Sequence, residues 1–299
     1  MKKIFLLSIF FFTLMQLSGH VFKSNWGGLD ANTMSDERKN TQPTSLEFIK
    51  DYTVNMASLT SDKGMKTLGL IGGTSWHSTI EYYRYINESV NEYFGNNTNP
   101  PLLIYTLNQA QVHKYQNENN WTGIADMLVE GGKSLQNAGA EKLMFCANTP
   151  HKVYEQVQRQ LNIPILHIAD VTAKNIKKRG LKKVLFLGTK YTMVEDFMTQ
   201  RIADMGIEVL TPTKPKVIEE LHRIIIEELT YGKINPESKK YVLGVIELFE
   251  KQGITGVILG CTEFPLMIHE KDLQIPIFNT TKIHAKAGVN YILEDFKKE

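Results

Sequence analysis

Short apolar runs alternate with longer amphipathic stretches along the chain from Lys66 onward. This alternation is typical of strands separated by helices in a mostly parallel α/β sheet. The predicted strands are 66–71, 101–106, 142–146, 183–187, 208–211, 256–260 and 276–278. Helical spacing with few helix breakers predicts helices at 76–94, 122–138, 150–161, 193–205, 215–231 and 236–252.

An approximate internal repeat divides this α/β region into two similar halves. Residues 68–75 and 184–190 are both strands that run into a Gly-Thr turn. Each is followed by a later strand that ends in a polar cluster, at 143–151 and at 257–265. Ligands of open α/β sheets bind at the carboxyl ends of the strands, where all four of these segments end.

The repeat predicts an α/β fold of two pseudo-symmetric lobes, each a mostly parallel sheet flanked by helices, with a substrate cleft between them. We expect residues 65–172 and 284–299 to form the first lobe and residues 173–283 to form the second. A small molecule held in the cleft would then meet one polar cluster from each lobe.

The first 64 residues have a different character. Residues 1–19 have the layout of a secretory signal, with two lysines before an apolar run from Ile4 to Met15 and small residues after it. The run is too short to span a bilayer comfortably, so we expect no stable membrane span after processing. Residues 20–64 are polar and aperiodic, which predicts a flexible leader or linker. Use of the signal would make the protein periplasmic or secreted, whereas translation from Met65 would leave it cytoplasmic.

Composition excludes several classes of protein. The 34 basic and 32 acidic residues are scattered without blocks, so we expect no nucleic-acid partner. Cys146 and Cys261 are the only cysteines, which excludes a disulfide framework and provides too few soft ligands for structural zinc. Because the histidines also lack ligand spacing, we expect no metal site.

The two polar clusters carry the candidate chemistry. Asn148 and Thr149, and Thr262 and Glu263, place donors and acceptors beside the two cysteines. Such groups suit the ammonium and carboxylate of an amino acid, although they also suit the capping of the following helices. A thiol on each face of a substrate is apt for racemisation, because one thiolate removes the α-proton and the other thiol returns a proton to the opposite face.

Two other local patterns have weaker functional readings. Residues 72–75 after the first strand form a glycine turn that can hold a carboxylate, but they lack the spacing of a nucleotide-binding loop. Cys146 and His151 suggest a thiol–imidazole hydrolase only if they touch, which their separation across a strand-to-helix corner does not establish.

Several segments together resemble the aspartate/glutamate racemase family, especially its branch of aspartate/glutamate and broad-specificity amino-acid racemases. The similarity covers nearly all of residues 65–299. It is carried by the opening at 65–88 and by the motifs CANTPHK at 146–152, LHIAD at 166–170, LGTKYTM at 187–193, LGCTEFP at 259–265 and IHA at 283–285. The resemblance implies two pseudo-symmetric lobes, no pyridoxal phosphate or other cofactor, and a homodimer.

The resemblance also implies roles for individual residues. Cys261 matches the second catalytic cysteine of the family. Substrate-holding positions are matched by Asn148, Thr149, Thr189 and Thr262, with Gly73 and Thr74 on the opposite wall. The first thiol of the two-cysteine members directly precedes the Asn-Thr pair, a place that Ala147 occupies here.

The position of Cys146 therefore has two readings. A shift of one residue along a strand turns a side chain to the other face, which would point Cys146 away from the substrate. Alignment on Pro150 and Pro265 instead makes Cys146 the counterpart of Cys261.

The leading hypothesis is cofactor-independent racemisation of an α-amino acid, aspartate or glutamate, with Cys261 as one acid/base and Cys146 as the second. Ala147 motivates an alternative, a single-thiol lyase or isomerase of the same superfamily such as a decarboxylase. The export-like leader motivates another, a non-catalytic small-molecule binding protein. Residues 105–115 contain no Arg for a distal carboxylate, so His113 or Lys114 would have to replace it, or the substrate is neutral.

Overall fold

The computed structural model describes residues 64–296. The predicted signal at 1–19 and the leader up to residue 63 lie outside the described residues. Within residues 64–296, no helix is both long and apolar enough to cross a bilayer.

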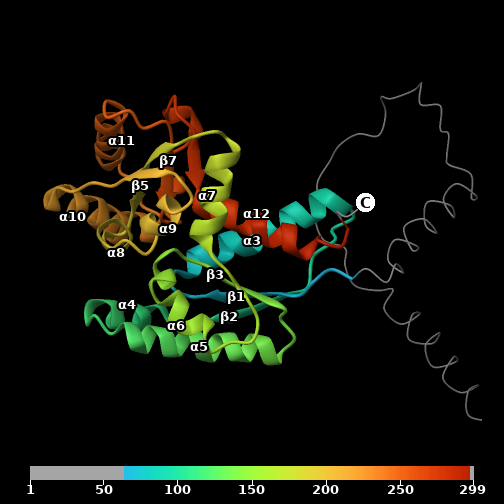
Figure 1. Ribbon diagram of the computed structural model, residues 1–299. Helices are drawn as coiled ribbons and strands as arrows, with labels where there is room; N and C mark the ends of the chain where they lie inside the picture. The colour runs from blue at the N-terminus through green and yellow to red at the C-terminus, as the bar shows by residue number, and fades with distance from the viewer. Residues whose placement is uncertain (1–63, 297–299) are drawn as a thin grey trace, which may run out of the picture. The chain divides into compact units, whose positions relative to one another are not determined.

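Two separate parallel sheets of four strands each form the centre of the fold (Figure 1). The first contains β1 (Leu68–Gly72), β2 (Leu102–Thr106), β3 (Lys142–Phe145) and β4 (Ile165–Leu166) in the order β2-β1-β3-β4. The second contains β5 (Lys183–Gly188), β6 (Glu208–Leu210), β7 (Val257–Gly260) and β8 (Ile277–Asn279) in the order β6-β5-β7-β8. Because the two orders are equivalent, the predicted α/β fold of two pseudo-symmetric lobes is confirmed.

Helices flank both sheets, as βαβ connections between parallel strands require. Those that follow the strands of the first sheet are α3 (Trp76–Phe94), α4 (Gln109–Asn117), α5 (Trp121–Asn137), η1 (Thr149–Val153), α6 (Tyr154–Gln158) and α7 (Ile168–Lys178). Those of the second are α8 (Lys190–Val194), α9 (Thr199–Ala203), α10 (Pro215–Arg223), η2 (Ile224–Glu228), η3 (Leu229–Tyr231), α11 (Pro236–Glu250), η4 (Phe264–Leu266), η5 (Glu270–Asp272) and α12 (Thr280–Ile292).

Three predicted helices are interrupted. The segment 150–161 is a 3-10 turn followed by a short α-helix, and 193–205 is divided by Glu195, whose backbone is extended. The segment 215–231 changes from α-helix to a π-helical turn at Ile224 and ends in a 3-10 turn before Gly232. A π-helical turn widens the helix locally and is frequent at functional sites.

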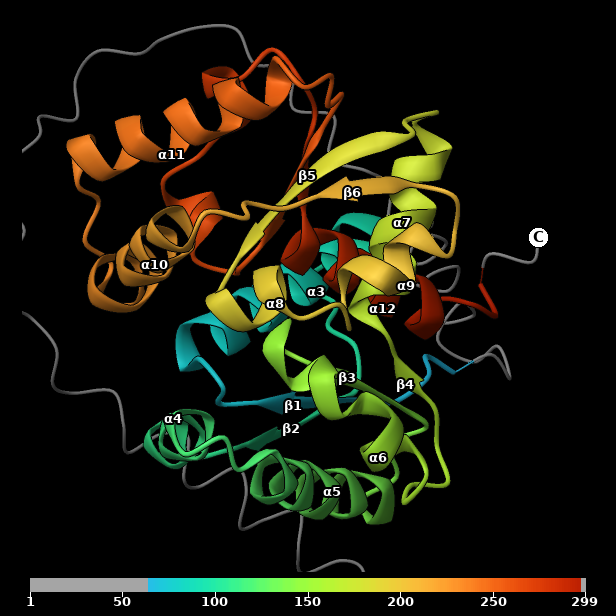
Figure 2. The ribbon, with the colours of Figure 1, turned by 60° about the vertical axis from the view of Figure 1, so that its left-hand side comes forward.

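The helices α7 and α12 join the two lobes (Figure 2). Ile168 and Ile176 of α7 pack into the core of the second lobe, although residues up to 172 were expected in the first. Helix α12 returns to the first lobe, where Val289 and Ile292 are buried in the same cluster as Leu68. It also packs against both α3 and α7. The strand ends of the two sheets therefore face a common space.

Candidate active site

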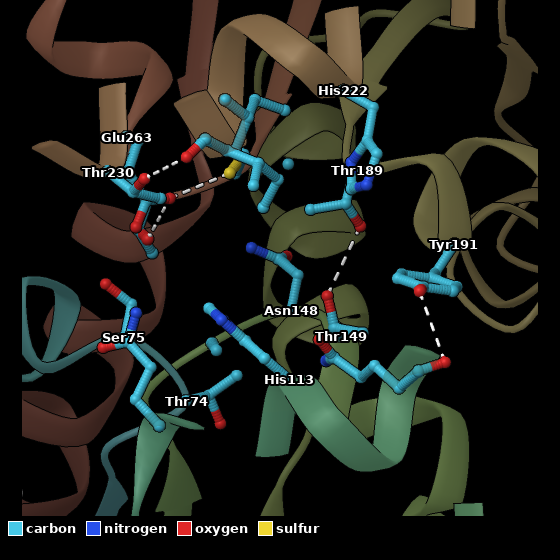
Figure 3. Close-up of a pocket in the computed structure, with 18 residues that line it drawn as sticks. Thr74, Ser75, His113, Asn148, Thr149, Thr189, Tyr191, His222, Thr230 and Glu263 are labelled. Atoms are coloured by element: carbon cyan, nitrogen blue, oxygen red, sulfur yellow. Dashed lines mark hydrogen bonds between the residues drawn. The ribbon is translucent and has the colours of Figure 1, made fainter. Parts of the chain in front are cut away.

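A cavity of about 60 Å³ lies between the lobes at the carboxyl ends of β1, β3, β5 and β7 (Figure 3). On this measure one water molecule needs roughly 10–15 Å³, so the space accommodates a small ligand. Seven of the residues predicted to form the site line it: Thr74, Asn148, Thr149, Thr189, Cys261, Thr262 and Glu263. The polar clusters of the two lobes are thus brought together as the sequence repeat predicted.

A hydrogen bond in the cavity joins the thiol of Cys261 to Glu263. The Sγ of Cys261 donates to Oε2 of Glu263 at 2.8 Å, and Oγ1 of Thr262 donates to the same oxygen at 2.8 Å. Both Cys261 and Glu263 are buried. Burial, together with the negative charge of Glu263, raises the pKa of the Cys261 thiol well above its ordinary value. Cys261 is therefore a neutral thiol in the unliganded protein, poised as a proton donor.

Asn148 presents an open acceptor to the same cavity. Its Nδ2 donates to Oγ1 of Thr280 at 3.1 Å, which fixes the orientation of the amide. Its Oδ1 is buried and has no hydrogen-bond partner within residues 64–296. An unpaired buried acceptor is costly, and a ligand that carries N–H donors would satisfy it. The ammonium group of an amino acid has this chemistry.

Three polar contacts cross the boundary between the lobes. Oγ1 of Thr149 lies 3.4 Å from Oγ1 of Thr189, and Lys152 Nζ donates to Glu195 Oε1 at 2.7 Å. The hydroxyl of Tyr191 donates to the carbonyl oxygen of Gln116 at 3.4 Å (Figure 3). All three contacts are part-buried.

Gly73 does not line the cavity, and its expected place on the substrate wall is corrected. Its φ is +85°, and a Cβ there would lie 2.1 Å from the carbonyl oxygen of Leu107. The position therefore requires glycine for backbone reasons. Its N–H donates to Oγ1 of Thr79 at 3.0 Å. Gly73 shapes the turn that delivers Thr74 and Ser75 to the cavity.

Cys146 likewise lies outside the cavity, so the structure corrects its expected role as a second catalytic thiol. Its backbone N–H continues the sheet by donating to the carbonyl oxygen of Ile71 at 2.9 Å. Its side chain is buried in the apolar cluster that contains Tyr82 and Leu70, on the face of the sheet that α3 and α12 cover. Ala147, one residue later, lines the cavity instead. The alternation of side chains at a strand end separates the two residues.

His151 is held by the backbone and does not hydrogen-bond to Cys146. Its Nδ1 lies 3.1 Å from the carbonyl oxygen of Ala147 and 3.2 Å from that of Asn148, while its Nε2 accepts from the N–H of Ile168 at 3.3 Å. Both ring nitrogens of His151 are engaged by backbone groups. The contact between His151 and Cys146 that a thiol–imidazole hydrolase would need is therefore not made. Burial lowers the pKa of His151 to about 4.

Most of the other lining residues were not predicted from the sequence; the exceptions are His113, expected only as a substitute for an Arg, and Ser75, part of the 72–75 turn. In the first lobe, Gln109, His113 and Gln116 occupy one face of α4 at the spacing i, i+4 and i+7. In the second lobe, the π-helical turn brings Ile225 and Ile226 to the cavity. Ser75, Tyr191, His222, Thr230 and Gly260 also line the cavity.

Comparisons with known proteins identify the family of the chain. The sequence pattern described as Asp/Glu/Hydantoin racemase matches residues 71–288. The chain belongs to the Asp/Glu/Hydantoin racemase family. The family works without a cofactor, and its members among the curated relatives are isomerases.

Individual relatives of this racemase-family chain are similar over most of the described region. A protein of Yersinia pestis assigned to the Asp/Glu racemases is 42% identical, covers 77% of this chain and 100% of its own, and superposes with a TM-score of 0.72. An aspartate racemase homologue from Pyrococcus horikoshii OT3 is 41% identical, with coverages of 76% and 99% and a TM-score of 0.68. The broad specificity amino-acid racemase RacX of Bacillus subtilis (strain 168) is 26% identical over 169 residues, which are 56% of this chain and 71% of RacX.

The described part of this racemase-family chain contains no group of three or more His, Cys, Asp or Glu side chains placed to hold a metal ion. Glu263 is the only charged side chain among the described residues that line the cavity. The chemistry available at the cavity is thus that of one thiol, one carboxylate, imidazoles, amides and hydroxyls.

Proposed function

We propose that the cavity catalyses racemisation of an α-amino acid, with Cys261 as an acid/base at Cα. The observation that carries this proposal is the buried Cys261 thiol hydrogen-bonded to Glu263 in an interlobe cavity beside the unpaired Oδ1 of Asn148. The thiol can transfer a proton at Cα, and the carboxylate and the open amide acceptor suit the ammonium group of an amino acid.

Substrate binding would change the state of the thiol. An ammonium group placed near Oδ1 of Asn148 and Glu263 would compensate the negative charge that raises the pKa of the Cys261 thiol. A lower thiol pKa makes proton exchange with Cα easier in both directions, because an efficient acid/base has a pKa near the working pH. Glu263 would thus couple recognition of the ammonium group to activation of the thiol.

Aspartate and glutamate are the first substrates to test because of the family. The residues of 64–296 that line the cavity include no Lys or Arg, so a distal carboxylate would meet imidazole and amide groups. Burial lowers the pKa of His222 to about 4, so this imidazole is neutral near pH 7. A panel that also contains alanine and serine therefore decides the side-chain preference.

The experiment is proton NMR of the full-length chain in D₂O with separate L- and D-enantiomers of aspartate, glutamate, alanine and serine. Loss of the α-proton signal is followed together with chiral chromatography. Exchange accompanied by inversion supports the proposal. A folded protein that exchanges none of the four amino acids contradicts it for this panel.

A decarboxylase of the same superfamily is the second candidate, and the observation that favours it is Ala147 at the cavity wall. A single thiol can protonate one face of an enolate after carbon dioxide leaves. Release of carbon dioxide from a disubstituted malonate, without inversion of any amino acid, would replace the racemase proposal with this one.

Assembly as a homodimer is a further part of the proposal. Trp76, Ile80 and Tyr83 are 51%, 52% and 48% exposed and share one face of α3. A second copy of the chain would cover this apolar stripe. Sedimentation equilibrium of the wild-type chain and of Ile80→Lys tests it: we expect a dimer that the substitution weakens, and a wild-type monomer at micromolar concentration contradicts it.

Export through the amino-terminal segment is proposed from the sequence alone. Mass spectrometry of the natural N-terminus in its own cells decides between a cleaved signal, an intact chain and translation from Met65.

A further inference from the structure

Inversion at Cα needs a proton-transfer group on each side of the substrate, and the first lobe lacks the thiol that would supply one. Ala147 lines the cavity with a methyl side chain, whereas Cys146 is outside the lining and is buried in the apolar cluster between the first sheet and the helices α3 and α12. Cys261 belongs to the second lobe, at the end of β7. The partner of Cys261 therefore has to be another group on the first-lobe wall.

Only one titratable side chain of the first lobe lines the cavity within the described residues, and it is His113. The helix α4 carries it there, because Gln109, His113 and Gln116 form the face of α4 toward the cavity while Val112 on another face is buried in the core. Figure 3 shows His113 reaching toward the cavity from the side opposite to Glu263. The two ring nitrogens of His113 have no hydrogen-bond partner among residues 64–296, so they are open to a ligand.

The charge states of His113 and Cys261 in the empty cavity are complementary. Burial lowers the pKa of His113, opposed by the charge of Glu263, so the imidazole is neutral at neutral pH and can accept a proton. The Cys261 thiol is protonated and donates to Glu263. One wall thus carries a base and the other carries an acid before substrate arrives.

We propose that His113 is the second acid/base of the reaction and that it works with Cys261 as an imidazole–thiol pair. This inference rests on the proposed racemase function. For one enantiomer, the Cα–H bond breaks, its proton passes to a ring nitrogen of His113, and its electron pair stays on the substrate as an enolate. The S–H bond of Cys261 then breaks, and its proton forms the new Cα–H bond on the opposite face.

The step leaves His113 as imidazolium and Cys261 as thiolate, so protons and charges balance. The opposite enantiomer reacts with the protein in this protonation state. The Cys261 thiolate removes its α-proton, and the His113 imidazolium donates a proton to the other face of Cα. Exchange of both groups with water restores the resting pair. The two directions therefore use the same two residues in exchanged roles.

His113→Gln in the full-length chain tests the assignment with the D- and L-amino acids of the panel above. Because general acid–base groups contribute about 10²–10⁴-fold, we expect inversion to fall by at least about 100-fold. We also expect Cys261 to continue to exchange the α-proton of one enantiomer for deuterium without inversion, since it can remove and return a proton on its own face. A residue that only binds substrate would not produce this separation of exchange from inversion.

The double variant His113→Gln/Ala147→Cys supplies the rescue. It places a thiol on the first-lobe wall in the absence of the imidazole, and we expect it to restore inversion in both directions. His269→Gln is the matched control, because His269 is exposed and lies outside the cavity lining. It should leave inversion as in the wild type.

The outcomes separate this inference from the proposed function. If the wild type inverts an amino acid and His113→Gln still inverts it at a similar rate, the second acid/base is not His113 while the racemase function stands. Loss of both exchange and inversion in His113→Gln without rescue by Ala147→Cys also overturns the assignment. A wild-type protein that neither exchanges nor inverts fails the proposed function itself.

Discussion

The Sγ of Cys261 lies 2.8 Å from Oε2 of Glu263 and donates a hydrogen bond to it inside the interlobe cavity. A carboxylate so close to a nucleophilic thiol works against thiolate formation, because it adds a negative charge where another would form. In the resting enzyme the Cys261 thiol is therefore protonated. A cationic group near Glu263 is needed to lower the pKa of the thiol. An α-ammonium group satisfies this need.

Glu263→Gln should lower the pKa of the Cys261 thiol. The charge of Glu263 contributes to the raised pKa after burial itself, and glutamine removes the charge while keeping an acceptor. The measurement is the pH dependence of ultraviolet thiolate absorbance in a Cys146→Ala background, in which Cys261 is the only cysteine. An unchanged or higher midpoint in Glu263→Gln would contradict the role of the carboxylate.

Cys146→Ala should destabilise the fold without affecting the reaction. Cys146 is 2% exposed and packs as a small apolar side chain in the first-lobe cluster. Removal of one buried heavy atom costs about 1 kcal/mol of the free energy of unfolding by analogy with a buried methylene. Urea denaturation measures this loss, and the racemisation rate of the folded variant should equal that of the wild type. A large loss of the racemisation rate in Cys146→Ala would show that Cys146 takes part in the reaction and would contradict this prediction.

The buried histidines of the first lobe should make the protein less stable below neutral pH. His284 accepts from the hydroxyl of Tyr82 at 2.8 Å and donates to the carbonyl oxygen of Leu166 at 2.9 Å. Burial lowers its pKa to about 3 and that of His151 to about 4. An unfolded histidine titrates near 6.5, so the unfolded chain binds protons that the folded chain does not as pH falls through that value.

The stabilisation is therefore complete above about pH 6.5 and is lost below it, by up to about 1.4 kcal/mol per pH unit for each such histidine. His284→Gln should reduce the slope of unfolding free energy against pH between about pH 7 and 5, where the unfolded group titrates. The exposed His269→Gln serves as the comparison and should keep the wild-type slope. Equal slopes of unfolding free energy against pH in His284→Gln and His269→Gln would contradict a contribution of buried His284 to the pH dependence.

The sheets could be predicted because their strands are continuous apolar runs between turn residues. The core strand β7 was expected at 256–260 and lies at Val257–Gly260. The two-residue edge strand β4 was missed because a run of two residues has no recognisable period. Helix α4 was missed because Val112 is its only fully buried residue, so its sequence lacks the apolar stripe that marks a helix. Its N-cap, Asn108, and its contact with α5 hold it in place.

The candidate site was predicted well where its residues follow strands and poorly elsewhere. The clusters after β3 and β7 face each other because the lobes are related by the repeat, so Asn148 and Cys261 could be expected to meet. The choice between Cys146 and Ala147 could not be made, because two alignments of the repeat gave opposite faces. The hydrogen bond from the Cys146 N–H to the carbonyl oxygen of Ile71 fixes where the strand ends. That position decides which of Cys146 and Ala147 faces the cavity. Ile225 and Ile226 reach the cavity from the π-helical turn, which the spacing of apolar residues in the sequence does not predict.

Comparison of Cys261→Ala with Cys146→Ala in the D₂O assay tests the central claim most directly. Both substitutions remove one buried thiol, and only Cys261 lines the cavity. We expect inversion to fall by at least about 100-fold in Cys261→Ala, the minimum contribution of a general acid–base group, and to persist in Cys146→Ala. Inversion that persists in a folded Cys261→Ala protein would contradict the account.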